Sequence, residues 1–245
     1  MLPVAILAGG VATRLGALTK TLPKALIEIH GEPFLAHQLR LLSRSGIRKI
    51  VLCVGYRCDQ IRDFAGDGRR FNLDVEYSFD GAELLGTAGA IRKALRRLGP
   101  AFFVLYGDSY LPCDYAAVER QFSLSGSLGL MTVFHNAGDG DASNVEFSEG
   151  SILEYDKVHP TPRMRHIDYG LGVFHDRVFR ELTGPGPLDL AEVYRDLLRR
   201  GQLASYEAEQ RFYEIGSHGG IAELSRFLAH RESGVSPPES EARAL

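Results

Sequence analysis

The sequence predicts an α/β fold: a doubly wound, mostly parallel, Rossmann-like sheet between two layers of helices, with antiparallel strands added to it. Short runs of continuous apolar residues at 4–7, 49–55 and 101–106 are typical of parallel strands that are covered on both faces. Amphipathic stretches at residues 33–45 and 88–98 lie between these runs and predict helices. Strands and helices therefore alternate through the first half of the chain, as in a three-layer sandwich.

The second half of the chain has a different pattern. Residues 144–147 and 152–155 flank a glycine-containing turn sequence at 148–151, and this arrangement predicts an antiparallel hairpin. Antiparallel strands are therefore expected to extend the parallel sheet. The remaining predicted elements are helices at residues 176–182 and 189–200, a strand near residues 211–215 and a last helix at residues 221–231.

Length and composition predict a single catalytic domain over residues 1–232. Of the 245 residues, 44% are hydrophobic and 24% are charged, as in an ordinary globular protein. Residues 233–245 are polar and rich in Pro, Ser and Glu, a composition that predicts a disordered tail. The formal net charge of −3 gives no general basic surface, so neither nucleic acid nor an acidic membrane is an expected partner.

The cysteines and the N-terminal residues predict a cytoplasmic protein. The chain has 3 cysteines, an odd number without the spacing of metal ligands, which favours reduced thiols in the cytosol. The apolar stretch at the N-terminus is short and has no basic residues before it. It therefore predicts neither a signal peptide nor a membrane span.

The chemistry is expected at one edge of the sheet. In doubly wound sheets, ligands bind outside the carboxyl ends of the strands, at the point where the strand order reverses. Gly9 and Gly10 follow the first predicted strand, and Asp108 follows the strand at residues 101–106. These residues are therefore expected to meet in one crevice.

The segment after the first strand has the composition of an anion-binding site. Glycines let backbone amides approach a triphosphate closely. Arg14 adds a fork of donors for phosphate oxygens, and Lys24 adds a compact positive charge for the α-phosphate. Alternatively, the double glycine is only a tight turn and both cations are solvated surface charges. The residues of this segment that are expected to bind a nucleotide are Leu7, Ala8, Gly9, Gly10, Thr13 and Arg14.

A second candidate segment is LGTAGA at residues 85–90. Its small residues would leave a flat wall for a nucleotide base, and main-chain groups there could read the edge of the base. Gly86, Thr87 and Ala88 are therefore expected to bind the nucleotide. The alternative is a glycine-rich helix start in which Thr87 is the N-cap.

These motifs resemble those of the sugar-1-phosphate nucleotidyltransferases, in particular short forms such as D-glycero-D-manno-heptose-1-phosphate guanylyltransferase and N-acetylmuramate-1-phosphate uridylyltransferase. The first segment is similar to the family's glycine-rich turn, T-R-L and P-K signature, with Ala12 where another glycine is usual. The second is similar to its L-G-T-A/G-G-A segment. The resemblance covers residues 3–230 and implies the GT-A-like nucleotidyltransferase fold.

The resemblance also implies a Mg²⁺ site. Asp108 matches the aspartate of the family's G-D motif, which binds magnesium. Glu214 lies in a segment similar to W/F-x-D-I-G-T/S, where aspartate is usual, and is expected to be the second metal ligand. Magnesium prefers hard oxygen donors and needs only one or two protein carboxylates when it also binds phosphate. The alternative for Glu214 is a glutamate in solvent at a strand end.

Two further segments resemble the family's sugar-phosphate site. Residues 154–157 are similar to its E-K segment, which assigns Lys157 to the sugar phosphate; the alternative is an exposed strand lysine. Residues 168–174 are similar to its N-A-G-x-Y-V-F strand, but an Asp-Tyr pair replaces Asn-Ala and changes the surface that would meet sugar hydroxyls. The residues expected to bind the sugar phosphate are Asn144, Glu154, Lys157, Asp168, Tyr169 and Gly170.

The reaction implied by the resemblance is in-line attack of a sugar 1-phosphate oxygen on the α-phosphorus of a nucleoside triphosphate, without a covalent intermediate. Arg14, Lys24 and Asp108 are the expected catalytic residues, and Mg²⁺ is the expected cofactor. GTP is the favoured nucleotide, with UTP and CTP as alternatives. The partners are thus the nucleoside triphosphate and the sugar 1-phosphate, and the chain is expected to be a monomer or a homodimer.

Three other functions share the same opening turn. They are a cytidylyltransferase for a phosphorylated amino-alcohol, a molybdopterin guanylyltransferase and a non-catalytic nucleotide-binding regulatory module. The molybdopterin enzymes lack the long spacing between T-R-L and P-K. A regulatory module would not need Lys24 and Asp108 together.

Overall fold

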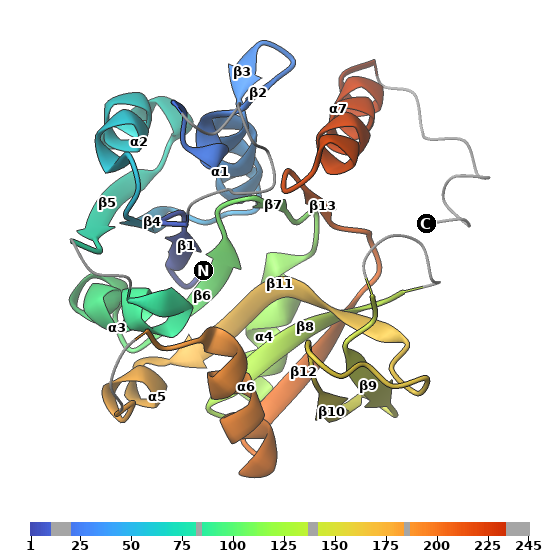
Figure 1. Cartoon of the computed structure of the whole chain (residues 1–245). Coiled ribbons are helices and arrows are strands. Elements are labelled where there is room, and N and C mark those ends of the chain that lie inside the picture. The colour runs from blue at the N-terminus through green and yellow to red at the C-terminus, as the bar shows by residue number, and fades with distance from the viewer. Residues whose placement is uncertain (11–20, 82–84, 137–141, 184–186, 234–245) are drawn as a thin grey trace.

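The computed structural model describes residues 1–10, 21–81, 85–136, 142–183 and 187–233 (Figure 1). Residues 234–245, which make up most of the predicted tail, lie outside the described residues. The described chain forms a nine-stranded mixed sheet with helices on both faces, and two small two-stranded sheets lie beside it. The predicted α/β fold class is therefore confirmed.

Four parallel strands form the part of the sheet that comes from the first half of the chain. Their order from the edge is β5 (Asp74–Phe79), β4 (Lys49–Val54), β1 (Val4–Leu7) and β6 (Ala101–Tyr106). The chain runs outward from β1 to β5 and then returns to the other side of β1, where β6 pairs with it. The strand order therefore reverses at β1, and the crevice beyond β1 is the expected ligand site.

The second half of the chain extends the sheet beyond β6. Strand β11 (His166–His175) is antiparallel to β6, and β8 (Gly129–His135) is antiparallel to β11. Strand β12 (Leu203–Ala208) adds to β8 in parallel. The predicted hairpin is β9 (Val145–Ser148) with β10 (Ser151–Tyr155), and it joins the sheet through β11.

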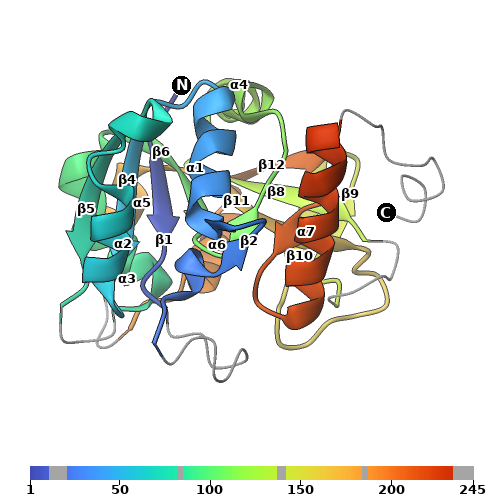
Figure 2. The same ribbon diagram turned by 90° about the horizontal axis from the view of Figure 1, so that it is seen from above.

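Helices cover both faces of the sheet (Figure 2). One face carries α1 (Phe34–Arg44), α2 (Cys58–Ala65) and α4 (Tyr115–Ser125), and the other carries α3 (Gly86–Leu98), α5 (Asp176–Arg180) and α6 (Leu190–Arg199). Side chains of β1 alternate between the two cores, with Val4 and Ile6 on the first face and Ala5 on the second. This two-sided burial explains why the parallel strands are continuously apolar in sequence.

A third apolar cluster joins the last helix to the sheet edge. Strand β7 (Ser109–Tyr110) pairs antiparallel with β13 (Tyr213–Glu214), and α7 (His218–Ser233) packs on them together with α1. The hairpin of β2 (Glu28–Ile29) and β3 (Glu32–Pro33) leads into α1 and contributes Ile29 to the same cluster. Apolar packing therefore holds Tyr213 and Ile215, the neighbours of Glu214, and Tyr110, which lies two residues after Asp108.

The predicted helices and strands are present, with ends shifted by a few residues. The predicted strand at 211–215 is only the two residues of β13, and α7 begins at His218 rather than at residue 221. The sequence analysis missed α2, β5, α4, β8 and β12. Two of these elements carry weak signals: α2 has 8 residues, of which Ile61 and Ala65 are buried, and β12 buries only Ser205 and Ala208. Strand β8, by contrast, has a detectable apolar run whose Leu130, Met131 and Val133 are buried.

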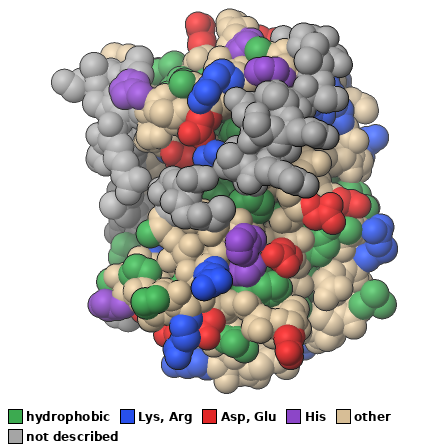
Figure 3. Space-filling model, turned by 90° about the vertical axis from the view of Figure 1, so that its right-hand side faces the viewer, with side chains coloured by type: hydrophobic (Ala, Val, Ile, Leu, Met, Phe, Trp, Pro, Cys, Tyr) green, Lys and Arg blue, Asp and Glu red, His purple; other side chains and the backbone are tan. Residues whose placement is uncertain are grey.

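The surface of the described residues agrees with the modest net charge. Lys, Arg, Asp and Glu side chains of both signs are interspersed over the described part of the face in Figure 3. None of the helices formed by the described residues combines the length and the apolarity that a membrane crossing requires.

Candidate active site

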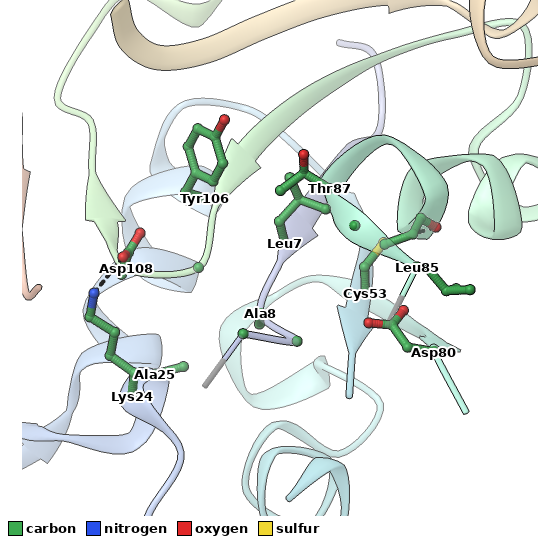
Figure 4. Close-up of a pocket in the computed structure, with 15 residues that line it drawn as sticks. Leu7, Ala8, Lys24, Ala25, Cys53, Asp80, Leu85, Thr87, Tyr106 and Asp108 are labelled. Atoms are coloured by element: carbon green, nitrogen blue, oxygen red, sulfur yellow. Dashed lines mark hydrogen bonds and ion pairs between the residues drawn. The ribbon is translucent and has the colours of Figure 1, made fainter. Parts of the chain in front are cut away.

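A pocket opens at the switch point, beyond the carboxyl ends of β1 and β6 (Figure 4). The structure brings six of the predicted nucleotide-binding residues together there: Leu7, Ala8, Gly9, Gly10, Gly86 and Thr87. Ala88 is fully buried behind the wall, and Thr13 and Arg14 lie outside the described residues. The other lining residues are Lys24, Ala25, Cys53, Asp80, Leu85, Ala90, Tyr106, Gly107 and Asp108.

The turns after β1 and β6 are packed against each other. The amide of Gly107 donates to the carbonyl of Leu7 at 2.9 Å, and the amide of Ala8 donates to the carbonyl of Cys53 at 2.8 Å. A Cβ on Gly107 would lie 2.8 Å from the Cβ of Ala8, so only glycine fits at this crossing. The close approach places Asp108 directly beside the Gly9-Gly10 turn.

Lys24 and Asp108 form the polar end of the pocket. They are 84 positions apart in sequence, and Lys24 Nζ donates to Asp108 Oδ2 at 2.5 Å. Lys24 begins the short 3-10 helix Lys24–Leu26, whose Ala25 and Leu26 are buried and anchor the lysine backbone. The side chains of Lys24 and Asp108 keep 19% and 33% exposure, so a ligand can reach both.

Glu214 lies next to this pair. The amide of Ile215 donates to the carbonyl of Asp108 at 3.0 Å, and Glu214 is paired with Ser109 in the β7–β13 ladder. A Cβ on Gly216 would lie 2.2 Å from Glu214 Oε2 and 3.0 Å from Lys24 Nζ, so carboxylate and ammonium face the same small space. The two predicted metal ligands are therefore brought together, with the ammonium of Lys24 beside both.

This donor set fits Mg²⁺. Two carboxylates stand at or near a pocket that the Gly9-Gly10 turn also lines, and magnesium is bound in proteins by one or two carboxylates together with substrate phosphate oxygens. Within the described ranges there is no cluster of three or more His, Cys, Asp or Glu side chains that could enclose a metal by itself. The ammonium of Lys24 is itself a cation, and its place beside these carboxylates is one that suits a positive ion. Asp108 and Glu214 could hold the ion between them.

The start of α3 forms the wall of the pocket. Gly86 has φ +71°, and a Cβ there would lie 2.3 Å from the carbonyl oxygen of Leu188. The amide of Ala88 donates to the same carbonyl at 2.9 Å. The alternative in which Thr87 is the N-cap is wrong: the N-cap position is Leu85, and the hydroxyl of Thr87 instead accepts from the amide of Leu190 at 2.7 Å.

A second lysine–aspartate pair joins Lys157, which lies two residues after β10, to Asp168 on β11. Lys157 Nζ is 3.0 Å from Asp168 Oδ2, and the hydroxyl of Tyr155 donates to the same oxygen at 3.0 Å. Asp168 Oδ1 accepts from the amide of Gly170 at 3.0 Å, and the amide of Asp168 donates to the side-chain carbonyl of Asn144 at 2.9 Å. Four of the six residues predicted to bind sugar phosphate are thus joined in one network.

In this network, Asp168 fixes the positions of the groups that donate hydrogen bonds to it. Its side chain is only 2% exposed, and both of its oxygens already accept hydrogen bonds. Burial is the largest single influence and lowers the pKa of Lys157, but the charge and hydrogen bond of Asp168, together with Tyr106 and Asp189, raise it more, so the pKa lies above the ordinary lysine value. Lys157 therefore stays protonated and keeps 40% exposure toward solvent.

The other two residues predicted for the sugar-phosphate site lie elsewhere. The side chain of Tyr169 is 1% exposed and packs between the rings of Phe134 and Phe212 in the core, so it offers a sugar no surface. The carboxylate of Glu154 lies 3.7 Å from the guanidinium of Arg163. The expectation that the side chain of Tyr169 lines a sugar pocket is therefore wrong in this structure, because the alternation of β11 turns Tyr169 inward. The assignment of Glu154, whose side chain is exposed, stays a prediction.

Pocket residues that the sequence analysis missed include Cys53, Tyr106 and Asp80. Cys53 and Tyr106 belong to predicted strands and reach the pocket only because those strands end beside β1. Asp80 follows β5, which was not predicted, although an aspartate directly after a strand is a detectable signal. Burial raises the pKa of Asp80, and the nearby Lys93 lowers it less.

The family assignment rests on more than this geometry. The family model described as Nucleotidyl transferase matches residues 4–144 of the chain. This chain belongs to the nucleotidyl transferase family. The matched residues contain the Gly9-Gly10 turn, Lys24, the start of α3 and Asp108, which are the residues that form the pocket.

Curated relatives and solved structures extend this assignment. A mannose-1-phosphate guanyltransferase from Hypocrea jecorina is 29% identical over 95% of this chain and 67% of its own length. An N-acetylmuramate alpha-1-phosphate uridylyltransferase from Neisseria meningitidis serogroup B is 28% identical over 86% of this chain and 92% of its own length. HddC from Yersinia pseudotuberculosis, solved with GMP-PN, has a TM-score of 0.77 at 22% identity and covers 93% of this chain and 100% of its own. The predicted nucleotidyltransferase family and fold are confirmed.

Proposed function

We propose that this protein condenses a nucleoside triphosphate with a sugar 1-phosphate and releases pyrophosphate. The family assignment and the names of both curated relatives support this reaction class. The observation in the structure that supports it best is Lys24, which lies beside Asp108 and Glu214 at one end of a glycine-walled pocket. A positive charge, two carboxylates and a phosphate-binding turn are what nucleotidyl transfer requires.

The nucleotide is bound across the pocket. The backbone of Gly9 and Gly10 receives the triphosphate, and the wall at Gly86 and Thr87 receives the nucleoside. Lys24 neutralises the charge that develops on the α-phosphate and on the leaving pyrophosphate. Arg14 is proposed to hold the outer phosphates, as the sequence motif predicts.

The proposed cofactor is Mg²⁺, held by Asp108 and Glu214. When bound, it would act as a Lewis acid and offset the negative charge of the triphosphate. The β7–β13 ladder fixes the spacing of these two carboxylates, because Glu214 pairs with Ser109, the residue after Asp108. The orientation of the phosphates therefore depends on backbone pairing as well as on side chains.

The sugar 1-phosphate is proposed to bind at Lys157. Its ammonium, which Asp168 keeps protonated, can hold the acceptor phosphate while Gly170 leaves room beside Tyr106 and Ser109. A phosphate oxygen of the acceptor then forms a bond to the α-phosphorus as the bond from that phosphorus to the bridging oxygen of pyrophosphate breaks. No base is needed, because the attacking oxygen is already ionised.

GTP is the proposed nucleotide, and UTP and CTP are the alternatives. The two relatives named above differ in this respect, one being named a guanyltransferase and the other a uridylyltransferase. We further propose a cytoplasmic enzyme that acts as a monomer or a homodimer and needs no nucleic acid or membrane. The free state of Cys53, Cys58 and Cys113 supports a reducing compartment.

The test is a matrix of nucleoside triphosphates against sugar 1-phosphates, read by pyrophosphate release with magnesium present. Turnover of at least one pair supports the proposal. Tight nucleotide binding without turnover across a panel of hexose, hexosamine, heptose and muramic acid 1-phosphates would contradict it and would favour a regulatory nucleotide-binding module.

A further inference from the structure

The side chain of Asp80 enters the nucleotide pocket with a buried oxygen that lacks a donor. Its backbone is fixed: the amide donates to the carbonyl of Val54 at 2.8 Å, and the carbonyl accepts from Lys93 Nζ at 2.9 Å. Asp80 Oδ1 is buried, and in the described structure no group donates a hydrogen bond to it. A carboxylate oxygen that is removed from water without a donor costs free energy. Donors supplied by a ligand would remove that cost.

Two glycines make room for this carboxylate. A Cβ on Gly9 would lie 2.6 Å from Asp80 Oδ2, and a Cβ on Gly55 would lie 3.2 Å from the same atom. Any other residue at Gly9 would displace the carboxylate or the turn after β1. The position of Asp80 is therefore set by three strand ends, those of β1, β4 and β5, and does not depend on a flexible loop.

Asp80 and the Lys24–Asp108 pair lie at opposite ends of the pocket (Figure 4). Asp80 stands with Cys53 and Leu85 at the end farther from the cationic site. A carboxylate would repel the phosphates of a nucleotide, so it belongs with the uncharged part of the ligand. If the phosphates lie at Lys24, the base extends toward Asp80.

An ionised carboxylate only accepts hydrogen bonds, and its two oxygens suit two N–H donors that lie side by side. Guanine presents such a pair on its Watson–Crick edge, at N1 and at the 2-amino group. Uracil and thymine present one N–H between two carbonyls, which a carboxylate would repel. Cytosine and adenine present an amino group beside a ring nitrogen that only accepts.

We propose that Asp80 is a specificity-determining residue that accepts hydrogen bonds from N1–H and the 2-amino group of guanine, and so selects GTP. This inference rests on the proposed function, because it requires that the pocket bind a nucleoside triphosphate. Within that function, it names the residue that determines which base the pocket prefers. It also gives the half-buried carboxylate a partner in the substrate complex that the free protein lacks.

The experiment compares the protein with Asp80→Asn by calorimetric binding of GTP, ITP, UTP and CTP in magnesium buffer. Inosine lacks the 2-amino group but keeps N1–H, so it reports on one of the two hydrogen bonds. The unmodified protein is expected to bind GTP about tenfold or more tightly than ITP, the scale of a lost hydrogen bond to a charged group. Asp80→Asn is expected to lose most of this preference and to narrow the difference between GTP and UTP.

Asp74→Asn is the matched control, because it makes the same charge change at the exposed start of the same strand. It should leave all four affinities unchanged. A second readout is the melting temperature without nucleotide, which Asp80→Asn should leave equal or raise, because the amide removes a poorly solvated charge.

Four outcomes would overturn the inference. An equal loss of affinity for all four nucleotides would mean that Asp80 binds the ribose. Unchanged base preference with a lower melting temperature would mean that Asp80 is structural. A protein that prefers UTP or CTP, with a preference that Asp80→Asn leaves intact, would refute the inference and leave the proposed function standing. Absence of any nucleotide binding would refute both.

Discussion

Among the described residues, the lysine–aspartate pairs Lys24–Asp108 and Lys157–Asp168 differ in burial. In the first, Lys24 and Asp108 approach to 2.5 Å at the mouth of the pocket, and both side chains remain partly exposed. In the second, Lys157 and Asp168 lie 3.0 Å apart, and Asp168 is 2% exposed while Lys157 is 40% exposed. The first carboxylate is free to exchange its partner for another cation. The second is held by Tyr155 and Gly170 and cannot.

The difference separates two tasks. An open pair can rearrange when a metal ion and phosphates arrive, so its charges serve the chemical step. A buried carboxylate that accepts several hydrogen bonds holds its lysine in one place, so that pair serves binding and the shape of the site. Substitutions in the first pair should therefore change kcat, and substitutions in the second should change KM and stability.

The largest effect is expected from Asp108→Ala. It removes a proposed metal ligand and the partner of Lys24, so kcat should fall by about a thousandfold or more. Pyrophosphate release measures the rate, and a thermal melt should show an intact fold. Asp59→Ala, the same change at an exposed helix residue, is the control. Near-normal turnover would remove Asp108 from the reaction.

Lys24→Ala should be the next most severe change. The loss of one electrostatic stabiliser of the transition state costs about 10²- to 10³-fold in kcat. KM for the sugar 1-phosphate should change little, because that phosphate is assigned to Lys157. Steady-state kinetics with each substrate varied in turn would separate the two constants. An effect confined to KM would assign Lys24 to substrate binding. The two lysine–aspartate pairs would then no longer differ in their roles.

Lys157→Met tests the second pair. The loss of a charged hydrogen-bond donor should raise KM for the sugar 1-phosphate about thirtyfold and leave kcat nearly unchanged. It also leaves Asp168 buried without its cation, which should cost about 2 kcal/mol of unfolding free energy after allowance for the exposure of the lysine. Urea titration measures this cost. Arg163→Met, which breaks exposed contacts with Glu146 and Glu154, should cost about 0.5 kcal/mol.

The smallest effect is expected from Gly216→Ala, which probes the space beside the first pair. The new Cβ would overlap Glu214 Oε2, and Lys24 Nζ lies 3.0 Å away from it, so both side-chain ends must move. We expect kcat to fall about tenfold while the fold persists, since misplacement rather than loss of a charge is involved. Gly219→Ala is the matched control, because the nearest atom to its Cβ, Ser217 Oγ, is at 3.8 Å.

Sequence reasoning succeeds where the signal is local. The apolar runs at β1, β4 and β6 predict the sheet, and the rule for switch points is enough to predict that Gly9 and Asp108 meet in one pocket. The meeting of Asp108 with Glu214 follows from family motifs. It could not follow from propensity, because β7 and β13 have two residues each and form only when paired.

Sequence reasoning fails where the role of a residue depends on distant partners. Asp168 and Tyr169 are both expected at the sugar, but strand alternation turns Tyr169 into the core. Asp168 meets Lys157 and Tyr155 through pairing in space that the sequence does not encode locally. Asp80 is not predicted as a pocket residue because the strand before it, β5, is not predicted either. Each failure concerns the direction of a side chain or a weakly marked strand rather than the class of the fold.

The pairing of β7 with β13 sets an order of events during synthesis. The residues proposed to bind the nucleotide are made early, whereas Glu214 is made long after Asp108 and is placed beside it by this ladder and by the hydrogen bond from the amide of Ile215 to the carbonyl of Asp108. A nascent chain that ends before β13 can form the parallel sheet but has only one of its two carboxylates in place. Under the proposed function, the second proposed metal ligand therefore takes its place late in synthesis, in one step, when the segment from β13 to α7 packs onto the sheet. A ribosome-bound fragment that ends before β13 would lack this second proposed metal ligand.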